Sequence, residues 1–215
     1  FAGTNSRFNQ LTVDGVRQND DFGLNNNGYP TQRSPISLDA VEAVNVSVAP
    51  YSVINNGFVG GQINAVTKSG SNEFHGSAFY EYSDRDLQGD KIEGVKVGAP
   101  FKEKTYGATL GGPIIKDRLF FFGSYEKFKG TLGFDEAPAG GSASVIIPRI
   151  TQAAIDTFRA DTQRVYGYDP GTAVSGGFPV SDEKWLGKVD WNITDNHRAS
   201  FTYQNTKGNS LNGSV

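Results

Sequence analysis

The side chains best suited to acid–base or metal chemistry are few and lie far apart. Neither of the two histidines, His75 and His197, has a carboxylate nearby at the spacing of metal ligands. The chain contains no cysteine, which excludes disulfides, thiolate metal sites and cysteine nucleophiles. No Ser, His and Asp residues are spaced for nucleophilic catalysis, and the Gly-Gly pairs fall in predicted strands rather than in phosphate-binding loops. The sequence therefore predicts a protein that is not an enzyme, with no cofactor and no catalytic or metal site.

The other stretch with chemical capacity is residues 18–29, QNDDFGLNNNGY, which consists largely of Asn, Asp and Gly. One interpretation is a solvated loop. A second is a ligand-facing apex loop, because Asn and Asp carry hydrogen-bonding groups on short side chains. A calcium site at the two aspartates finds no support in the spacing, which matches no EF-hand loop. The candidate ligand-facing residues are Asp20, Asp21, Asn25, Asn26 and Asn27.

The bulk composition excludes some classes of protein and leaves others open. The net charge is −3 with a pI near 5.4, which argues against a nucleic-acid partner because such proteins usually present a basic face. No window approaches the roughly 18 apolar residues of a membrane helix, but a transmembrane β-barrel has no such runs either. The chain has no Met and starts FAGTNSRF, so we expect it to be an internal piece of a longer protein.

Residues 1–70 are predicted to form a small, glycine-rich α+β unit. We expect a strand at residues 8–16, with Leu11, Val13 and Val16 buried and Asp14-Gly15 opening a turn. A short helix is expected over residues 35–42, capped by Ser37. The alternating valines of residues 44–48 and the segment 60–67 predict two further strands. Three glycines in and before the last of these strands are predicted structural pivots: Gly57, Gly60 and Gly61.

From residue 73 onward, two-residue alternation predicts long strands with two different faces. The clearest strand is residues 184–194, where Trp185 and Trp191 share one face while Leu186, Lys188 and Asp190 share the other. A slip of one residue would reverse both faces, and a lysine facing lipid at mid-depth costs roughly 2–4 kcal/mol. The register is therefore predicted to be strongly fixed. The other predicted strands are residues 74–83, 106–112, 119–126 and 199–204.

Short and long connections alternate between these strands. The turns at residues 115–118 and 195–198 are short, whereas the connections at about 84–104 and 130–183 are long and polar. Outer-membrane barrels have short periplasmic turns and long extracellular loops, and aromatic girdles near both strand ends. The candidate girdle residues are Tyr82, Tyr106, Phe121, Trp185, Trp191 and Tyr203. The same aromatics could instead form the core of a secreted or surface-exposed β-sandwich, as in an adhesin or glycan-binding module.

The longer connection is predicted to contain a helix over residues 150–165. Ile155, Phe158, Thr162 and Val165 recur at helical spacing after Pro148. Two interpretations are open: a surface helix lying over the mouth of a barrel, and a helix that binds a partner.

Two stretches resemble one protein family. The run VEAVNVSVAPYSVINNGFVGGQINAVTKSGSNEFHGSAFYEY resembles the junction between plug and barrel in TonB-dependent outer-membrane receptors. LGGPIIKDRLFFFGSYE and RITQAAIDTFRADTQRVYGYDPG are similar to the Oar-like branch of that family. The resemblance implies an α+β plug at residues 1–70, incomplete at its N-terminus. It also implies that residues 71–215 form the first portion of an antiparallel transmembrane β-barrel, about five strands of some 22, with a short helix in an extracellular loop.

The resemblance also implies a function. We expect a fragment of a transporter in the outer membrane of a Gram-negative-type cell, in contact with membrane lipid, in which the plug faces the periplasm and gates energy-coupled import or export. The partner it implies is the TonB complex, but the TonB-contacting segment cannot be located in these residues. NVSVAP at residues 45–50 replaces the more common Val-x-x-Gly-Pro pattern, which fits the Oar-like branch and not the siderophore receptors. The expected substrate is therefore a peptide, protein or glycan rather than an iron chelate.

Overall fold

The computed structural model describes residues 5, 8–23, 25–48, 60–88, 91–96, 101–134, 136–141, 143, 145–171 and 176–210. Contacts divide the chain into two compact units. The first comprises Phe1–Glu81, Thr105–Lys129 and Ser181–Ser210, and the second comprises Tyr82–Lys104, Gly130–Val180 and Leu211–Val215. Among the described residues, no helix is both long and apolar enough to cross a membrane.

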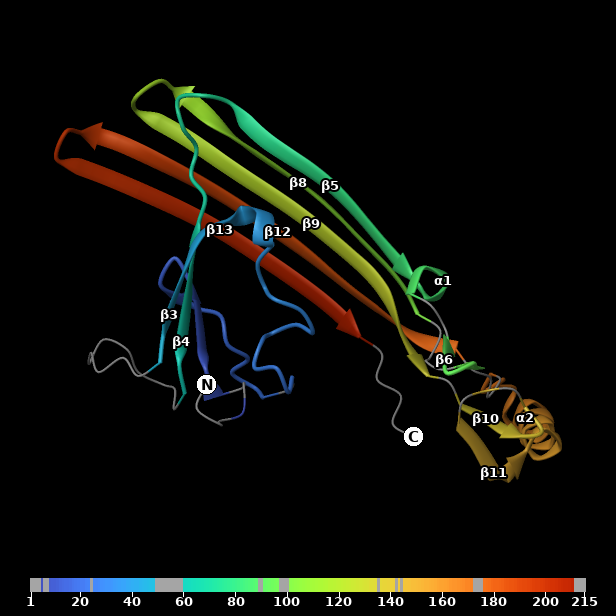
Figure 1. The fold of residues 1–215 in the computed structure, drawn as a ribbon. Helices are drawn as coiled ribbons and strands as arrows, with labels where there is room; N and C mark the ends of the chain where they lie inside the picture. Colours follow the sequence, from blue (N-terminus) through green and yellow to red (C-terminus); the bar gives the residue numbers. More distant parts are fainter. Residues whose placement is uncertain are drawn as a thin grey trace. The chain divides into compact units, whose positions relative to one another are not determined.

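The N-terminal part of the first unit is a four-stranded sheet, here called the N-terminal sheet (Figure 1). Its strands are β1 (Gln10–Val13), β2 (Val16–Arg17), β3 (Val41–Ser47) and β4 (Gln62–Thr67). Their spatial order is β2-β1-β4-β3. β1 lies parallel to β4, whereas β2 and β3 pair antiparallel with β1 and β4. The two central strands are therefore joined by a long excursion of the chain and not by a hairpin.

The predicted strand at residues 8–16 is in fact a hairpin. Asp14 and Gly15 both have positive φ, 47° and 82°, which is the geometry of a two-residue turn that Asp-Gly favours. Leu11 and Val13 are buried as expected, but Val16 lies beyond the turn and is 63% exposed. The expectation that Val16 is buried is wrong because the reversal moves it out to the edge strand β2.

The predicted helix at residues 35–42 is reduced to one 3-10 turn, Leu38–Ala40. Ser37 precedes it with extended backbone angles but makes no side-chain capping hydrogen bond. The chain becomes a strand already at Val41, which pairs with Thr67 of β4. β-branched residues such as Val41 favour a strand over a further helical turn. Residues 41 and 42, predicted to end the helix, therefore belong to β3.

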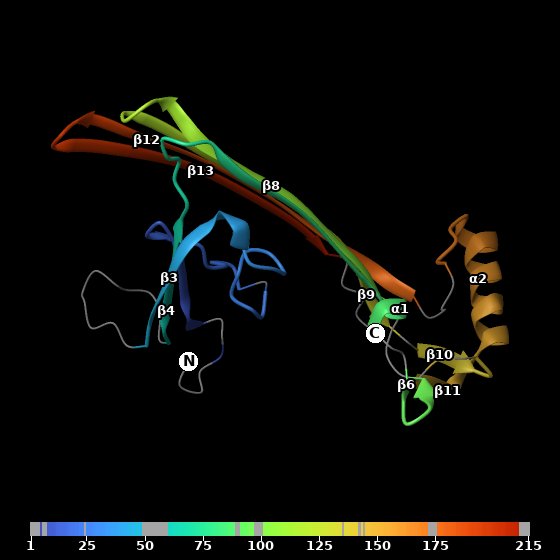
Figure 2. The ribbon, with the colours of Figure 1, turned by 45° about the horizontal axis from the view of Figure 1, so that its top comes forward.

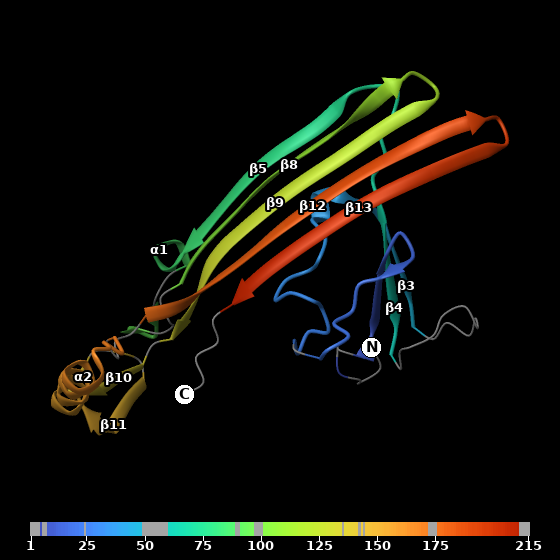
Figure 3. The same cartoon turned by 180° about the vertical axis from the view of Figure 1, so that it is seen from behind.

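A five-stranded sheet forms the rest of the first unit and extends beyond it; we call this sheet the wall (Figure 3). Its strands are β5 (His75–Asp84), β8 (Lys102–Ile115), β9 (Leu119–Phe134), β12 (Gly176–Thr194) and β13 (His197–Ser210). They neighbour one another in chain order, so each strand returns beside the previous one. The turns after β8 and β12 are short and the connections after β5 and β9 are long, as the sequence predicts. The predicted class, a mostly antiparallel β structure with few helices, is confirmed.

The strands of the wall are longer than the sequence predicts. The alternation predicts β8 at residues 106–112 and β13 at 199–204, but each strand has 14 residues. The long connections are correspondingly shorter, and they contain further small elements: α1 (Arg85–Gln88), β6 (Lys91–Ile92), β7 (Val95–Lys96), β10 (Glu136–Ala139), β11 (Val145–Thr151) and α2 (Gln152–Tyr166). Hydrophobic alternation fades where the strand ends become polar, but backbone pairing with the neighbouring strand continues.

The two faces of the wall differ as the alternation predicts. On β12, Leu186 and Lys188 are buried, whereas Trp185 and Trp191 are about half exposed. On β9, Phe122 is only 2% exposed. It packs with Leu186 and with Val13 and Ala65 of the N-terminal sheet in one hydrophobic cluster. We call the face that contacts the N-terminal sheet the inner face, and the opposite one the outer face.

The second unit contains the predicted helix, α2 (Figure 2). Thr151 caps its N-terminus by accepting a hydrogen bond from the Ala154 amide at 3.2 Å, and Gly167 ends it in the left-handed conformation. None of its residues is buried. The helix itself is confirmed, and its predicted place over the mouth of a barrel stays a prediction.

Candidate functional site

The first candidate site is a lysine of the wall that holds the end of the N-terminal sheet. Lys188 projects from the inner face of β12, and its Nζ donates to the carbonyl oxygen of Thr67 at 3.3 Å and to its Oγ1 at 3.1 Å. Asp14 completes the group, since its carboxylate accepts from the amide and hydroxyl of Thr67 and lies 3.8 Å from the ammonium. Thr67 is 2% exposed and Lys188 9% exposed, so these bonds are shielded from water. We call these three residues the Lys188 cluster.

A second set of charges lies on the same inner face further along β12. Lys184 donates to Glu126 of β9 at 2.6 Å and lies 3.4 Å from Asp182, and all three side chains are buried. Arg33, from the segment that precedes the 3-10 turn, lies 3.8 Å from Asp182 and stacks over the Phe128 ring at 4.0 Å. Two positive and two negative charges therefore compensate one another where the N-terminal segment meets the wall. We call Arg33, Glu126, Asp182 and Lys184 the Arg33 cluster.

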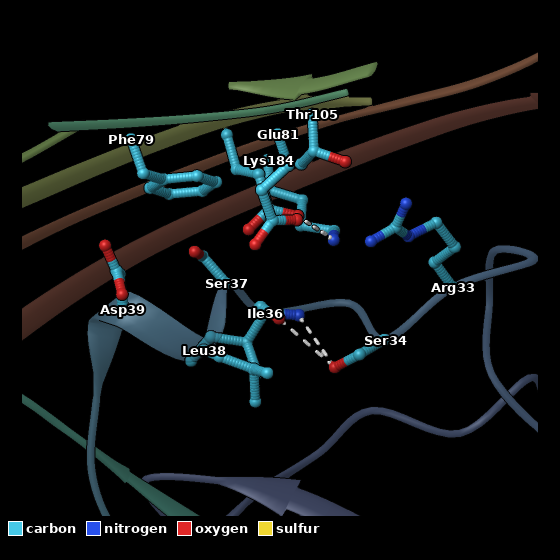
Figure 4. A pocket seen from close by; sticks show the side chains of 11 residues that line it. Arg33, Ser34, Ile36, Ser37, Leu38, Asp39, Phe79, Glu81, Thr105 and Lys184 are labelled. Carbon is cyan, nitrogen blue, oxygen red and sulfur yellow. Dashed lines mark hydrogen bonds and ion pairs between the residues drawn. The ribbon is translucent and has the colours of Figure 1, made fainter. Parts of the chain in front are cut away.

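A cavity of about 400 Å³ adjoins the Arg33 cluster (Figure 4). Residues 33, 34 and 36–39 line one side of it, and Phe79, Glu81 and Thr105 line the other from β5 and β8. Further hydrogen bonds join this segment to the wall. Ser77 donates to Asp39 at 3.1 Å, and Gln204 and Thr206 donate to the carbonyl of Pro35 at 3.1 and 2.8 Å. Polar groups from the first, fourth and fifth strands of the wall therefore hold residues 33–39.

The segment that joins β4 to β5 is fixed against the short-turn end of the wall. Asn72 and Asp117 bond reciprocally, with the Asn72 amide donating to the carboxylate at 2.6 Å and the Asp117 backbone N–H donating to Asn72 at 2.8 Å. A Cβ at Gly70 would lie 2.3 Å from the carbonyl oxygen of Phe121 and 2.8 Å from that of Gly112. Only glycine therefore allows the chain to pass this close to the two strands.

The candidate ligand-facing residues lie together in one loop, where several of them brace it. The Asp20 carboxylate accepts from the amides of Phe22 and Asn25 at 3.0 and 2.8 Å, and Asp21 lies 3.3 Å from Arg17. The Asn25 side chain donates to Tyr29, and that of Asn27 donates to Thr31 and Gln32. Asn26 is exposed. These bonds make the loop a defined structure, and its role toward a ligand stays a prediction.

Two of the predicted pivots, Gly60 and Gly61, lie just before β4. Gly60 donates its backbone N–H to Phe8, and the carbonyl of Gly61 accepts from Gln10, so both bond the chain just before β1. Gly57 lies outside the described residues. The two histidines are apart, His75 beside the carbonyl of Glu73 and His197 beside the Thr194 hydroxyl. Within the described ranges, no three His, Cys, Asp or Glu residues are grouped to hold a metal ion.

Sequence reasoning did not identify the Lys188 and Arg33 clusters as sites. It placed Lys188 on the polar face of its strand, but it could not pair that lysine with Thr67, which is 121 residues away. One usable signal is present: two lysines four residues apart, Lys184 and Lys188, flank Leu186 on one face of β12. Buried lysines at such spacing indicate a partner with acceptor groups.

Comparison with known proteins shows which family and which relatives the chain resembles. A family model described as an outer membrane beta barrel domain matches residues 66–177. The chain belongs to the outer-membrane β-barrel family. The chain is 30% identical over 216 residues to the TonB-dependent transporter Oar of Myxococcus xanthus, with 95% of the chain and 19% of that protein covered.

The chain also has a solved structural relative. Its fold matches the crystal structure of the siderophore receptor PirA from Acinetobacter baumannii with a TM-score of 0.60 and 17% identity, over 96% of the chain and 24% of PirA. The chain therefore spans about a fifth to a quarter of the length of these relatives.

These relationships decide between the interpretations that the sequence left open. The predicted resemblance to TonB-dependent outer-membrane receptors is confirmed, and the protein is located in the outer membrane. The alternative of a secreted β-sandwich is not supported. Both similar proteins are named as a transporter or a receptor, and neither as an enzyme.

Proposed function

We propose that residues 1–70 are part of a plug and that residues 71–215 are the first part of a barrel whose passage the plug gates. The observation that carries this proposal is the buried polar contact on the inner face of the wall. There, Lys188 binds Thr67 and Asp14, and Arg33 faces Asp182. A buried lysine on a barrel strand needs acceptors in the interior, and the N-terminal part of the chain supplies them for Lys188.

The contrast between the two faces of the wall supports the same proposal. The outer face presents exposed apolar and aromatic side chains, as a surface in contact with lipid does. The inner face of the same strands presents charged groups that are paired. Barrels of this kind have short periplasmic turns, so we assign the turns after β8 and β12 to the periplasm and the long connections to the cell exterior.

For the whole protein, we propose energy-coupled passage of a substrate with TonB as the inner-membrane partner. The similarity to the Oar transporter supports this role, and the departure from the siderophore-receptor pattern at residues 45–50 favours a peptide, protein or glycan as the substrate. The chain itself would catalyse no reaction. The braced loop at residues 20–32 is the proposed substrate-facing part of the plug, since its internal bonds hold its amide and carboxylate groups in fixed positions.

Gating can be tested in cells that produce the full-length protein. Deletion of residues 8–67 is expected to leave a heat-modifiable outer-membrane barrel and to make the cells sensitive to a hydrophilic antibiotic too large for porins. The matched control is the full-length protein produced at the same level. A heat-modifiable deletion variant that confers no sensitivity would contradict the gating proposal.

The orientation needs a separate test, which the absence of cysteine in these residues allows. Single cysteines at Thr162 in α2 and at Lys116 in the short turn are introduced into a full-length background without other reactive thiols. A membrane-impermeant maleimide added to intact cells is expected to label the cysteine at position 162 and not the one at 116. Labelling of position 116 alone would reverse the assignment.

A further inference from the structure

A row of aromatic side chains crosses the outer face of the wall within the first unit. Tyr106 of β8, Tyr125 of β9 and Trp185 of β12 lie side by side, with ring centroids 6.5 Å apart for the first pair and 4.3 Å for the second. Tyrosine and tryptophan at such positions lie at the level of the lipid headgroups. The row therefore marks one boundary of the membrane on this face.

A row of charges lies next to the aromatic row on the same face, on the side of the long connections. Lys127 and Glu183 form an ion pair, and the Trp185 indole N–H donates to the Glu183 carboxylate at 3.0 Å. On the inner face, Ser200 donates to Asp190 across β12 and β13 at 2.7 Å, which indicates how the two strands are aligned. Because the two strands are antiparallel, Glu183, seven residues before Asp190, lies opposite Lys207, seven residues after Ser200. The positive charge of Lys207 acts on the Glu183 carboxylate.

The balance of charge in this row is positive. Glu183 lies between Lys127 and Lys207, and Lys129 is exposed two residues further along the same face of β9. Each two-residue step along a strand moves roughly 6.6 Å, so these ammonium groups lie just outside the aromatic boundary. That is the depth at which lipid phosphates lie. Lysine reaches this level with its alkyl stem along apolar surface and its charge among the headgroups.

We propose that Lys127 and Lys207, with Lys129 beside them, form a binding site for the phosphate groups of an anionic lipid in the leaflet next to the long connections. Glu183 weakens this binding by competing for the two lysines. The lysines flank the carboxylate from adjacent strands, so a headgroup bearing two phosphates engages both at once. The site rests on the proposed orientation, which makes this leaflet the outer one of the outer membrane.

The test uses the full-length protein in a nonionic detergent, with heat-modifiable migration as the check that each variant is folded. The probes are fluorescent lipid A with both phosphates and the same lipid after removal of its phosphates. Lys127→Gln/Lys207→Gln is expected to weaken binding of phosphorylated lipid A about 30-fold, or about fivefold per lysine. Glu183→Gln removes the competing charge and is expected to tighten binding about fivefold, whereas the control Lys116→Gln leaves it unchanged.

A phosphate site predicts that the lysine variants weaken lipid binding and that Glu183→Gln strengthens it. A purely structural ion pair predicts a change in the same direction for both. Equal weakening by both, or equal binding of the dephosphorylated lipid, would overturn the site. Weakening by Lys116→Gln alone would place the phosphates at the short-turn end. That result overturns the site and also the orientation, which the maleimide labelling tests independently.

Discussion

Replacing Lys188 with Met tests whether the wall lysine holds the end of β4. Met keeps most of the aliphatic volume of the side chain, so packing against β12 changes little, but the ammonium is lost. The substitution removes two hydrogen bonds from a charged donor to a residue that is 2% exposed. Hydrogen bonds of this kind contribute about 1.5–3 kcal/mol each when they are counted singly.

The two bonds share one ammonium that must be desolvated, and Asp14 keeps its own bonds to Thr67. We therefore expect a loss of about 2 kcal/mol in the free energy that holds β4 in place, close to one such bond rather than the sum of both. A loss of 2 kcal/mol raises the population of the locally opened state about 30-fold. Amide exchange in Gln62–Thr67 should accelerate by the same factor, provided that closing is fast relative to exchange.

Hydrogen exchange of the full-length protein in detergent, read by mass spectrometry over peptides that cover β4, gives this factor directly. Lys116→Met, an exposed lysine in the short turn, is the matched control and should leave β4 unchanged. A double-mutant cycle with Asp14→Asn should give a coupling of at least 0.5 kcal/mol, because both residues bind Thr67. Less than a twofold change in β4 exchange with Lys188→Met would refute the inference that this lysine holds the N-terminal sheet to the wall.

Three further outcomes are expected. Gly70→Ala places a Cβ against the carbonyl oxygen of Phe121 and should lower the midpoint of thermal unfolding or prevent assembly, whereas Ser69→Ala next to it should have little effect. Phe122→Ala empties a site in the cluster that joins the two sheets and should cost about 3–5 kcal/mol in urea unfolding. The hydrogen bonds from the Arg159 guanidinium hold the pKa of Asp169 at about 2. The ion pair therefore contributes fully to stability above pH 3.8, and this contribution is lost as the pH falls through 2. NMR titration should show that Arg159→Gln raises the pKa of Asp169.

Much of the wall could be predicted from the sequence because its alternation is local. The pattern around Trp185 and Leu186 assigns both faces of β12 correctly, and the helical spacing of Ile155 and Phe158 locates α2. The alternation of short and long connections also needs no knowledge of distant contacts. These features depend on neighbours two to four residues apart, which a single sequence displays directly.

The parts that could not be predicted depend on residues far apart in the chain. Nothing near Lys188 indicates that Thr67 accepts its hydrogen bonds, and nothing near Gly70 indicates that the backbone of Phe121 lies against it. Asp14-Gly15 is a turn signal that the local pattern puts at the end of a longer strand, whereas in the structure it forms the turn of a hairpin. The helix expected around Ser37 is shorter because β3 begins at Val41 and pairs with β4. The local sequence pattern does not show this pairing.

The parallel pairing of β1 with β4 has a consequence for how the protein is assembled. The partners in that pair are 52 residues apart, and the lysine that holds the end of β4 follows 121 residues later. Contacts between such distant residues form slowly, because a large loop must close before any of them contributes. The N-terminal sheet therefore cannot reach its final stability until the fourth strand of the wall is in place. Formation of the fourth wall strand and completion of the N-terminal sheet are therefore coupled.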